Sequence, residues 1–274
     1  MNKLAELSQS RELILNLTLR ELRGKYKRSV LGWTWSLLNP ISTMAIYSLV
    51  FGLILKVKIP PGNPSGLEIF PLFLLCGLLP WNFIGNGMLG GMEALVGNAN
   101  LIKKVYFPRE VLVLASINSW MFSMCIEMSV LAVALLGAGN MILPWLPLVL
   151  FIMAIQMVFV TGVALLLSVC NVYFRDVRHL ITILLSLWFY LTPIVYPITL
   201  VPTHSRILGI NVASRTLYSA NPMVEFTQVY RDLLYDLRFP SMLQVGYLIA
   251  TSFAALFFGQ FAFSRLEGRL AEEL

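Results

Sequence analysis

The sequence predicts an all-α membrane protein with six transmembrane helices, from its composition and from the grouping of its apolar residues. Of the 274 residues, 58% are hydrophobic and 12% are charged, with a mean hydropathy of +0.76. A water-soluble domain needs more charge than this to cover its surface. The apolar residues form long blocks separated by short charged stretches, which is typical of membrane-spanning helices. We therefore expect a six-span domain over 31–274, preceded by a cytoplasmic helix within 1–30.

The first thirty residues predict an amphipathic helix that lies in the membrane interface. Within 10–29, one stripe at helical spacing is apolar and consists of Leu15, Leu19, Leu22 and Tyr26. A neighbouring face is basic and carries Arg20, Arg23 and Lys27. Such a helix directs its basic side toward acidic head groups or a partner protein. The segment lacks the uninterrupted apolar core of a cleavable signal peptide, so we expect the first span to act as the insertion signal.

Six apolar blocks follow, each close to the roughly 20 residues that cross the hydrocarbon core. The predicted spans run from about 33 to 55, 69 to 90, 111 to 136, 146 to 169, 180 to 201 and 243 to 263. Pro40 falls early in the first span and Pro80 near the middle of the second, where each removes a backbone hydrogen bond. Pro193 and Pro197 predict an irregular end for the fifth span.

The segment 202–240, between spans five and six, is too polar to span the membrane and too apolar for a plain loop. Apolar residues recur there at helical spacing, namely Met223, Phe226, Tyr230, Leu233 and Leu237. This pattern is compatible with short external re-entrant helices, and equally with an ordinary amphipathic surface helix.

The distribution of positive charge predicts the orientation in the membrane. Of the 20 Lys and Arg residues, fourteen fall on the side of the N-terminal helix and of the loops at about 91–110 and 170–180, and six fall on the other side. The positive-inside rule makes the first side cytoplasmic, with both termini there. The same rule accounts for the net charge of +6, so we expect no nucleic-acid partner.

Several kinds of chemistry are missing from the sequence. Gly24-Lys25 is followed by Tyr26 and lacks the upstream glycine of a phosphate-binding loop, and no zinc or hydrolase motif is present. We therefore predict no catalytic residue, no metal site and no cofactor in this chain. Glu127 is the one clearly intramembrane ionisable residue, which disfavours an ion-coupled secondary transporter. The three aspartates are too scattered for an enzyme of lipid-linked sugar assembly.

Two short cytoplasmic loops combine aromatic side chains with charges of both signs. The first contains Lys103, Lys104, Tyr106, Phe107, Arg109 and Glu110, and the second contains Phe174, Arg175 and Asp176. Aromatic and arginine side chains supply much of the energy of protein interfaces, so the loops are candidate docking surfaces. The alternative is a pair of ordinary positive loops with aromatic residues at the membrane boundary.

Most of the chain resembles the polysaccharide-export permeases of the type-2 ABC exporter superfamily. The similar runs include both loops, and they are RELRGKYK at 20–27, LGWTW at 31–35, LNP at 38–40, GLLPW at 77–81, TPIVYP at 192–197 and NP at 221–222. The chain departs from the pattern in lacking a proline soon after residue 110 and in a longer stretch over 202–221. These departures concern the exit of the first loop and the external mouth.

The resemblance implies an ATP-driven exporter in the bacterial cytoplasmic membrane. Two copies of the chain would pair, and two separate ATPase subunits, which bind ATP and Mg, would dock at the N-terminal helix and the two loops. The substrate would be a polyprenyl-linked glycan of the teichoic-acid, O-antigen or capsule type, with a slight preference for teichoic acid. A permease for a smaller lipid or drug is the alternative within the superfamily.

Two sets of residues are candidates for contact with such a substrate. Aromatic rings stack on the apolar faces of sugars, and the channel candidates are Tyr47, Phe51, Trp188, Phe189 and Tyr190. Each of them could instead be a packing or lipid-facing residue. The candidates for the lipid pyrophosphate are the basic residues Arg20, Arg23 and Lys27.

Overall fold

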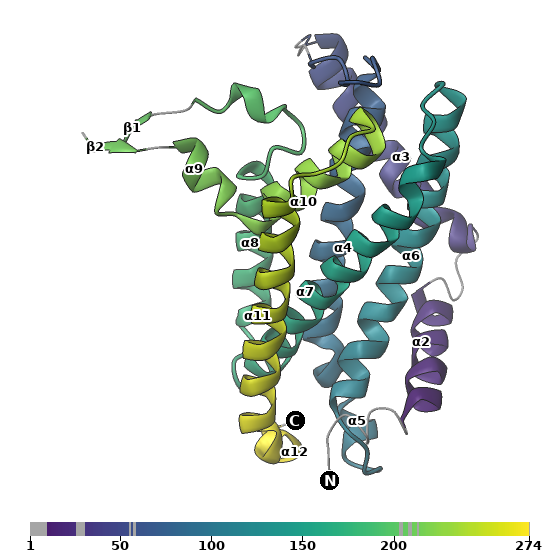
Figure 1. The fold of residues 1–274 in the computed structure, drawn as a ribbon. Coiled ribbons are helices and arrows are strands. Elements are labelled where there is room, and N and C mark those ends of the chain that lie inside the picture. Colours follow the sequence, from purple (N-terminus) through teal and green to yellow (C-terminus); the bar gives the residue numbers. More distant parts are fainter. Residues whose placement is uncertain are drawn as a thin grey trace.

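A computed structural model describes residues 10–25, 31–54, 56, 59–202, 205–207, 210–212 and 214–273. The described chain is a bundle of helices with one small hairpin (Figure 1). The helices are α2 (Arg11–Lys25), α3 (Trp35–Tyr47) continued by the π-helix η2 (Ser48–Ile54), α4 (Phe70–Gly97), α5 (Ala99–Ile102), α6 (Glu110–Gly137), α7 (Leu146–Tyr173), α8 (Val177–Tyr190), α9 (Ser214–Ser219), α10 (Pro222–Arg231) continued by the π-helix η5 (Asp232–Asp236), α11 (Met242–Leu266) and α12 (Leu270–Glu273). Short 3₁₀ turns are η1 (Gly32–Thr34), η3 (Leu143–Trp145), η4 (Ile198–Leu200) and η6 (Glu267–Arg269).

Five helical segments of the described chain are long and apolar enough to cross a membrane. They are Leu37–Ile54, Phe70–Gly97, Glu110–Gly137, Leu143–Tyr173 and Met242–Leu266, and they correspond to predicted spans one to four and six. The fifth predicted span is only partly helical, because α8 has 14 residues and ends at Tyr190. The helix ends two residues before Thr192. Thr192 precedes Pro193, and the ring of a proline disfavours helical backbone at the residue before it.

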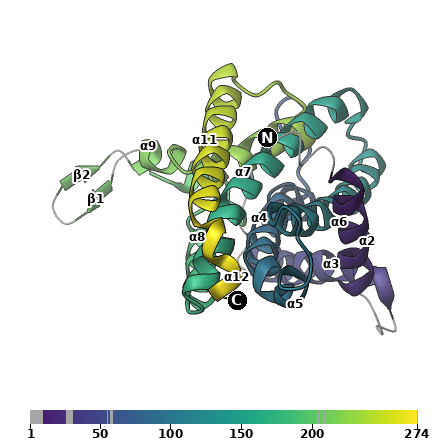
Figure 2. The same ribbon diagram turned by 90° about the horizontal axis from the view of Figure 1, so that it is seen from below.

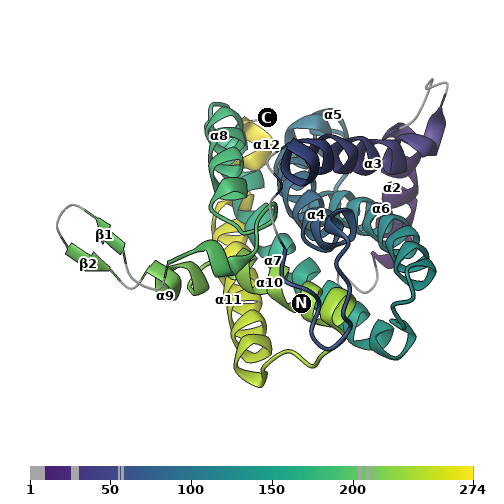
Figure 3. The same cartoon turned by 90° about the horizontal axis from the view of Figure 1, so that it is seen from above.

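Helix α4 lies at the centre of the bundle, between α3, α6, α7 and α8 (Figure 3). It packs closely on α7 because glycines face that helix: a methyl group on Gly91 would lie 2.7 Å from the Ala164 methyl carbon. Helices α7 and α11 approach even more closely. A methyl group on Gly162 or Gly259 would overlap the backbone of the opposite helix. Small residues permit such close packing within a membrane, where apolar burial adds little.

At the upper end in Figure 1, α10 and η5 form a buried cap over the bundle. The predicted helical run is helical and buried through Leu233, and the chain leaves the cap at Leu237 in the left-handed conformation. Asn140 donates to the carbonyls of Leu234 and Tyr235 at 2.8 and 3.2 Å, which ties η5 to the segment before α7.

One element was not predicted. Strands β1 (Ser205–Ile207) and β2 (Ile210–Val212) form an antiparallel hairpin that projects sideways from the bundle (Figure 3). The all-α prediction is confirmed for the rest of the described chain, and this hairpin lies within the segment noted as unusually long. Isoleucine in both strands and valine in β2 favour extended backbone. Runs of three residues are too short for this preference to stand out from the helical pattern around them.

Helix α2, the α5 loop, the start of α8 and the C-terminal helix α12 lie at the same end of the bundle (Figures 1 and 2). Helix α2 packs along α6 and buries Leu17 and Leu22. The predicted apolar stripe is therefore divided, since Leu22 packs inward whereas Leu15 and Leu19 are 61% and 47% exposed. Tyr26 and Lys27 lie outside the described residues.

Candidate functional site

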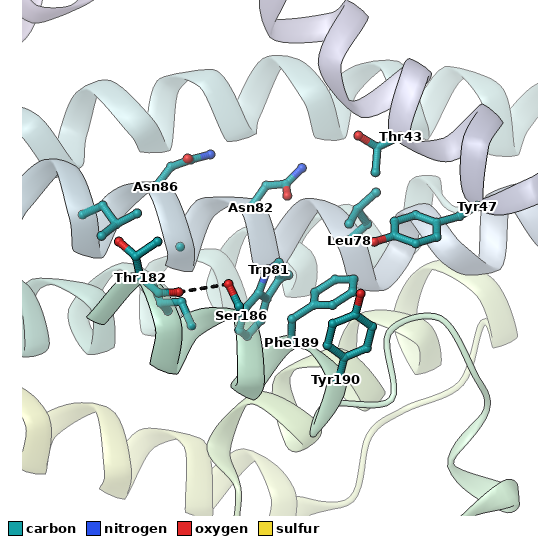
Figure 4. A pocket seen from close by; sticks show the side chains of 13 residues that line it. Thr43, Tyr47, Leu78, Trp81, Asn82, Asn86, Thr182, Ser186, Phe189 and Tyr190 are labelled. Atoms are coloured by element: carbon teal, nitrogen blue, oxygen red, sulfur yellow. Dashed lines mark hydrogen bonds between the residues drawn. The ribbon is translucent and has the colours of Figure 1, made fainter. Parts of the chain in front are cut away.

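A pocket of about 460 Å³ opens between α3, α4 and α8 (Figure 4). Each helix contributes polar side chains one turn apart, which are Thr43 and Tyr47 on α3, Asn82 and Asn86 on α4, and Thr182 and Ser186 on α8. Residues four apart share a helix face, so this spacing lines the pocket with hydroxyl and amide groups. None of the described residues that line the pocket carries a charge. The pocket is therefore polar but neutral.

Aromatic rings form one wall of the same pocket. Phe189 lies at the centre, with its ring 6.1 Å from Tyr47, 5.6 Å from Trp81 and 5.2 Å from Tyr190, measured between centroids. The ring of Trp188 lies 5.9 Å from that of Trp81, and the ring of Phe51 lies 5.9 Å from that of Tyr47. All five aromatic channel candidates thus belong to one connected cluster, although Phe51 and Trp188 do not line the pocket.

The aromatic wall is fixed at its upper end by hydrogen bonds to α10. Trp188 donates through its indole nitrogen to the Asn221 side-chain oxygen at 2.8 Å. The same oxygen caps α10 by accepting from the backbone nitrogen of Met223 at 3.0 Å. Arg231 donates to the carbonyls of Pro193 and Ile194, both at 2.6 Å, in the turn that follows α8. These contacts hold the end of α8 in place without a longer helix.

The opposite end of the bundle presents exposed aromatic and charged residues. Tyr106 is 99% exposed and Phe174 is 71% exposed. Lys103, Lys104, Arg175 and Asp176 are also exposed, so six of the nine docking candidates face outward. Residues 102–107 and Arg109 surround a hollow of about 230 Å³ at this end.

The other three docking candidates are held within the chain. Glu110 is 3% exposed and accepts a hydrogen bond from Gln260 of α11 at 2.8 Å. Arg109 donates to the carbonyl of Glu267, and Phe107 is half-buried against the core. These residues attach the first loop to the C-terminal part of the chain, so their direct exposure to a partner is small.

The basic residues of α2 are divided in the same way. Arg20 donates to the Asn98 side-chain oxygen at 2.5 Å and pairs with Glu21 at 3.1 Å, which links α2 to the end of α4. Arg23 is exposed. The third candidate, Lys27, lies outside the described residues. An ion pair of 2.7 Å between Glu93 and Arg178 joins the same end of α4 to α8.

Comparison with known proteins identifies the family. The family model described as ABC-2 type transporter matches residues 12–235, which is most of the chain. The chain belongs to the ABC-2 type transporter family. The resemblance found in the sequence is thereby confirmed, and the chain is the membrane permease component of a transporter that works with a partner ATPase subunit.

Curated relatives of this ABC-2 permease match along nearly its whole length. It is 31% identical over 271 residues to the O-antigen export system permease protein RfbA of Myxococcus xanthus, covering 98% of each chain. It is 28% identical to the protein of the same name from Klebsiella pneumoniae, covering 96% of this chain and 95% of the relative. It is 25% identical to the polysialic acid transport protein KpsM of Escherichia coli, covering 89% of each.

Among the described residues of the ABC-2 permease, no group of three or more His, Cys, Asp or Glu side chains could hold a metal ion. Sequence reasoning missed part of its pocket, including Trp81, Asn82 and Asn86 on α4. The signal was available: two asparagines one turn apart within an apolar span are costly unless they face water, a ligand or each other.

Proposed function

We propose that this permease exports a lipid-linked polysaccharide across the bacterial cytoplasmic membrane, as a pair of identical chains driven by two ATPase subunits. The observation that carries the proposal is the neutral pocket between α3, α4 and α8, with its aromatic wall and amide lining. The names of the relatives, which refer to O-antigen export and polysialic acid transport, support a substrate of the same class.

The chemistry of the pocket suits a glycan that must move through it. The rings of Tyr47, Phe189 and Tyr190 can contact the apolar faces of sugars, with Phe51 and Trp188 supporting them from behind. Asn82 and Asn86 can exchange hydrogen bonds with sugar hydroxyls. Among the described lining residues no charged side chain fixes a particular sugar, so successive units can bind and leave readily.

The positions of α2 and α12 support an even number of membrane crossings, namely six, with both ends of the chain cytoplasmic. Five crossings would leave α2 and α12 on opposite sides, yet both lie at one end of the bundle (Figure 1). Helix α8, about 21 Å long at 1.5 Å per residue, then makes the remaining crossing together with the turn at 191–196. The positive charge of that end makes it the cytoplasmic side, which leaves α9 and α10 as external re-entrant helices.

The ATPase subunits dock at this cytoplasmic end, on the loops of the 31–274 domain and on the helix within 1–30. Lys103, Lys104 and Tyr106 form one part of the surface, and Phe174, Arg175 and Asp176 form the other. Arg109, Glu110 and Phe107 hold the first loop in position. The hollow of about 230 Å³ inside that loop can receive a side chain of the ATPase. Arg20, Arg23 and Lys27 remain the proposed contacts for the lipid pyrophosphate.

Co-purification with the ATPase in mild detergent tests the proposal. Wild-type chain should retain the ATPase, and the variant Lys103→Glu/Lys104→Glu should lose it while inserting normally into the membrane. Arg215→Glu, which reverses an exposed charge at the other end, is the matched control. Equal ATPase retention in all three chains would refute the docking surface.

A second measurement tests the substrate. Asn82→Leu and Phe189→Ala should each reduce the surface glycan of cells that depend on this permease, without loss of the assembled complex. Phe257→Ala is the control, because Phe257 is an exposed aromatic residue of α11 that does not line the pocket. Normal glycan export by both pocket variants would exclude the pocket as the path.

A further inference from the structure

A second pocket, of about 500 Å³, lies between α2, α4 and α6. It is separate from the pocket with the aromatic wall, since none of the described residues lines both. Its lining includes Arg20 and Lys25 of α2, Glu93 of α4, and Ser119 and Trp120 of α6. The pocket opens at the end of the bundle that carries the docking loops, because Asn98 at the end of α4 also lines it.

Two polar groups in this pocket have no hydrogen-bond partner. The Lys25 ammonium nitrogen is buried and lies 3.3 Å from the centre of the Trp120 ring, without any acceptor. The Ser119 side chain is 1% exposed, and its hydroxyl oxygen likewise has no partner. Buried donors without acceptors are costly, so two in one pocket indicate a ligand that supplies acceptor oxygens.

The carboxylates of the pocket do not supply them. Glu21 pairs with Arg20 at 3.1 Å, and Glu93 pairs with Arg178 at 2.7 Å. Among the described residues, no ion pair to Lys25 closer than 4.0 Å is formed by Glu127 of α6 or by any other acid. The positive charge of Lys25 is therefore left for a bound anion.

We propose that this pocket binds the phosphate group of a lipid head group. Phosphate oxygens accept hydrogen bonds from an ammonium and a hydroxyl at once, which matches Lys25 and Ser119. The exposed leucines of α2, Leu15 and Leu19, place lipid next to the pocket. The phosphate can belong to a phospholipid of the bilayer or to a polyprenyl phosphate. Arg20, proposed above as a contact for the lipid pyrophosphate, also lines this pocket. The polyprenyl source therefore rests on the proposed function, whereas the phospholipid source does not.

The charge on Lys25 gives the site a pH dependence. Burial lowers the pKa of the Lys25 ammonium to about 7, although Glu21 and Glu127 act in the opposite direction. A phosphate beside the ammonium stabilises its charged form and raises that pKa. Binding of a phosphodiester head group, whose own charge is constant over this range, therefore weakens as pH rises from 6 to 8.5. The other charged groups that face Lys25 are Arg20 on α2 and Glu93 on α4. A Lys25→Met variant retains all of them, so its remaining pH dependence measures their contribution.

Native mass spectrometry of the full chain, purified with its ATPase in mild detergent, tests the site. The probes are phosphatidylglycerol, undecaprenyl phosphate and a phosphate-free diacylglycerol glycolipid. Lys25→Met should weaken binding of the phosphate lipids about tenfold or more, and Ser119→Ala should weaken it by a smaller factor. Arg11→Gln removes an exposed charge of α2 outside the pocket and should leave binding unchanged.

Each outcome decides the proposal. Lys25-dependent binding of phosphatidylglycerol, stronger at pH 6 than at pH 8.5, supports a membrane phospholipid as the source. Lys25-dependent binding of undecaprenyl phosphate alone supports the polyprenyl carrier. Equal binding of the phosphate-free glycolipid, or binding of every lipid that is unaffected by Lys25→Met and Ser119→Ala, overturns the phosphate site. Retention of the ATPase by these variants keeps this result separate from the test of the proposed function.

Discussion

Replacing Arg231 with methionine should destabilise the protein and disturb the aromatic wall of the pocket between α3, α4 and α8 at the same time. The guanidinium is 3% exposed, donates to the carbonyls of Pro193 and Ile194, and lies 3.7 Å from the centre of the Phe73 ring. Burial lowers the pKa of Arg231 to about 9, which leaves the group charged at neutral pH. Gly77 makes room for it, since a methyl group there would lie 3.3 Å from a guanidinium nitrogen.

The size of the effect follows from the contacts. A hydrogen bond from a charged donor contributes about 1.5–3 kcal/mol, and a desolvated ring contact about 2 kcal/mol or less. Methionine removes both hydrogen bonds and leaves two buried carbonyls without donors, so we expect a loss of about 3–5 kcal/mol. At about 2–4 °C per kcal/mol for a chain of this size, the Tm falls by about 10 °C. Arg231→Lys keeps the charge but not the paired geometry, and should fall in between.

Thermal unfolding in mild detergent, followed by tryptophan fluorescence, measures the Tm, and surface glycan measures export in cells. Arg215→Met is the control, because Arg215 is an exposed arginine on the same segment between α8 and α11. The reasoning is refuted if Arg231→Met and Arg215→Met unfold at the same temperature. A stable Arg231→Met protein with reduced export would assign Arg231 to the substrate path, instead of to the support of α8.

Three further predictions concern single side chains. Tyr106→Ala should reduce coupling to the ATPase while changing the Tm by less than about 2 °C, because the ring is 99% exposed; a large fall in Tm would show that it packs. Trp81→Leu should lower both Tm and export, because it removes two edge contacts worth about 0.5–1.5 kcal/mol each; unchanged values of both would contradict this. Burial raises the pKa of the Asp232 carboxyl, and Arg238, bonded to it at 2.6 and 2.9 Å, lowers it. Arg238→Ala raises the pKa of Asp232 further, so the stability of the folded variant falls as pH increases through that pKa. The Tm of the variant should therefore lie further below that of the wild type at pH 8 than at pH 5. An equal difference at both pH values would exclude this dependence on the Asp232 charge.

The long spans could be predicted from the sequence because hydropathy over 20 residues is a local property. The fifth span could not be predicted in the same way. Residues 191–201 are apolar enough to continue a helix, and only Pro193 and Pro197 indicate that they do not. What replaces the helix is a turn whose carbonyls bond to Arg231, nearly forty residues further along. The sequence pattern placed Arg231 among the charges of an external loop, whereas it is buried in the cap.

The candidate site shows the same division between local and tertiary information. Aromatic residues at helical spacing could be selected from the sequence, and they meet in one cluster. Trp81 was part of a run chosen by resemblance, without a structural reason, and its place between Trp188 and Phe189 depends on how α4 and α8 pack. On α2, the helical spacing of the apolar residues could not decide which of two adjoining faces would pack on α6. The structure leaves Leu15 and Leu19 exposed.

Helix α8 is held more firmly at its upper end than at its lower end. This difference determines how a movement of the loop before α8 is transmitted to the pocket. Its upper end is held by the buried Arg231 contacts, the half-buried Trp188–Asn221 hydrogen bond and a 3.1 Å hydrogen bond between Tyr196 and Tyr218. Its lower end is joined to α4 by the ion pair between Arg178 and Glu93, both substantially exposed, and such pairs contribute about 1 kcal/mol or less. A force applied at the second docking loop therefore meets little resistance at the lower end and much at the upper end. The lower part of the pocket should widen while Phe189 stays in place.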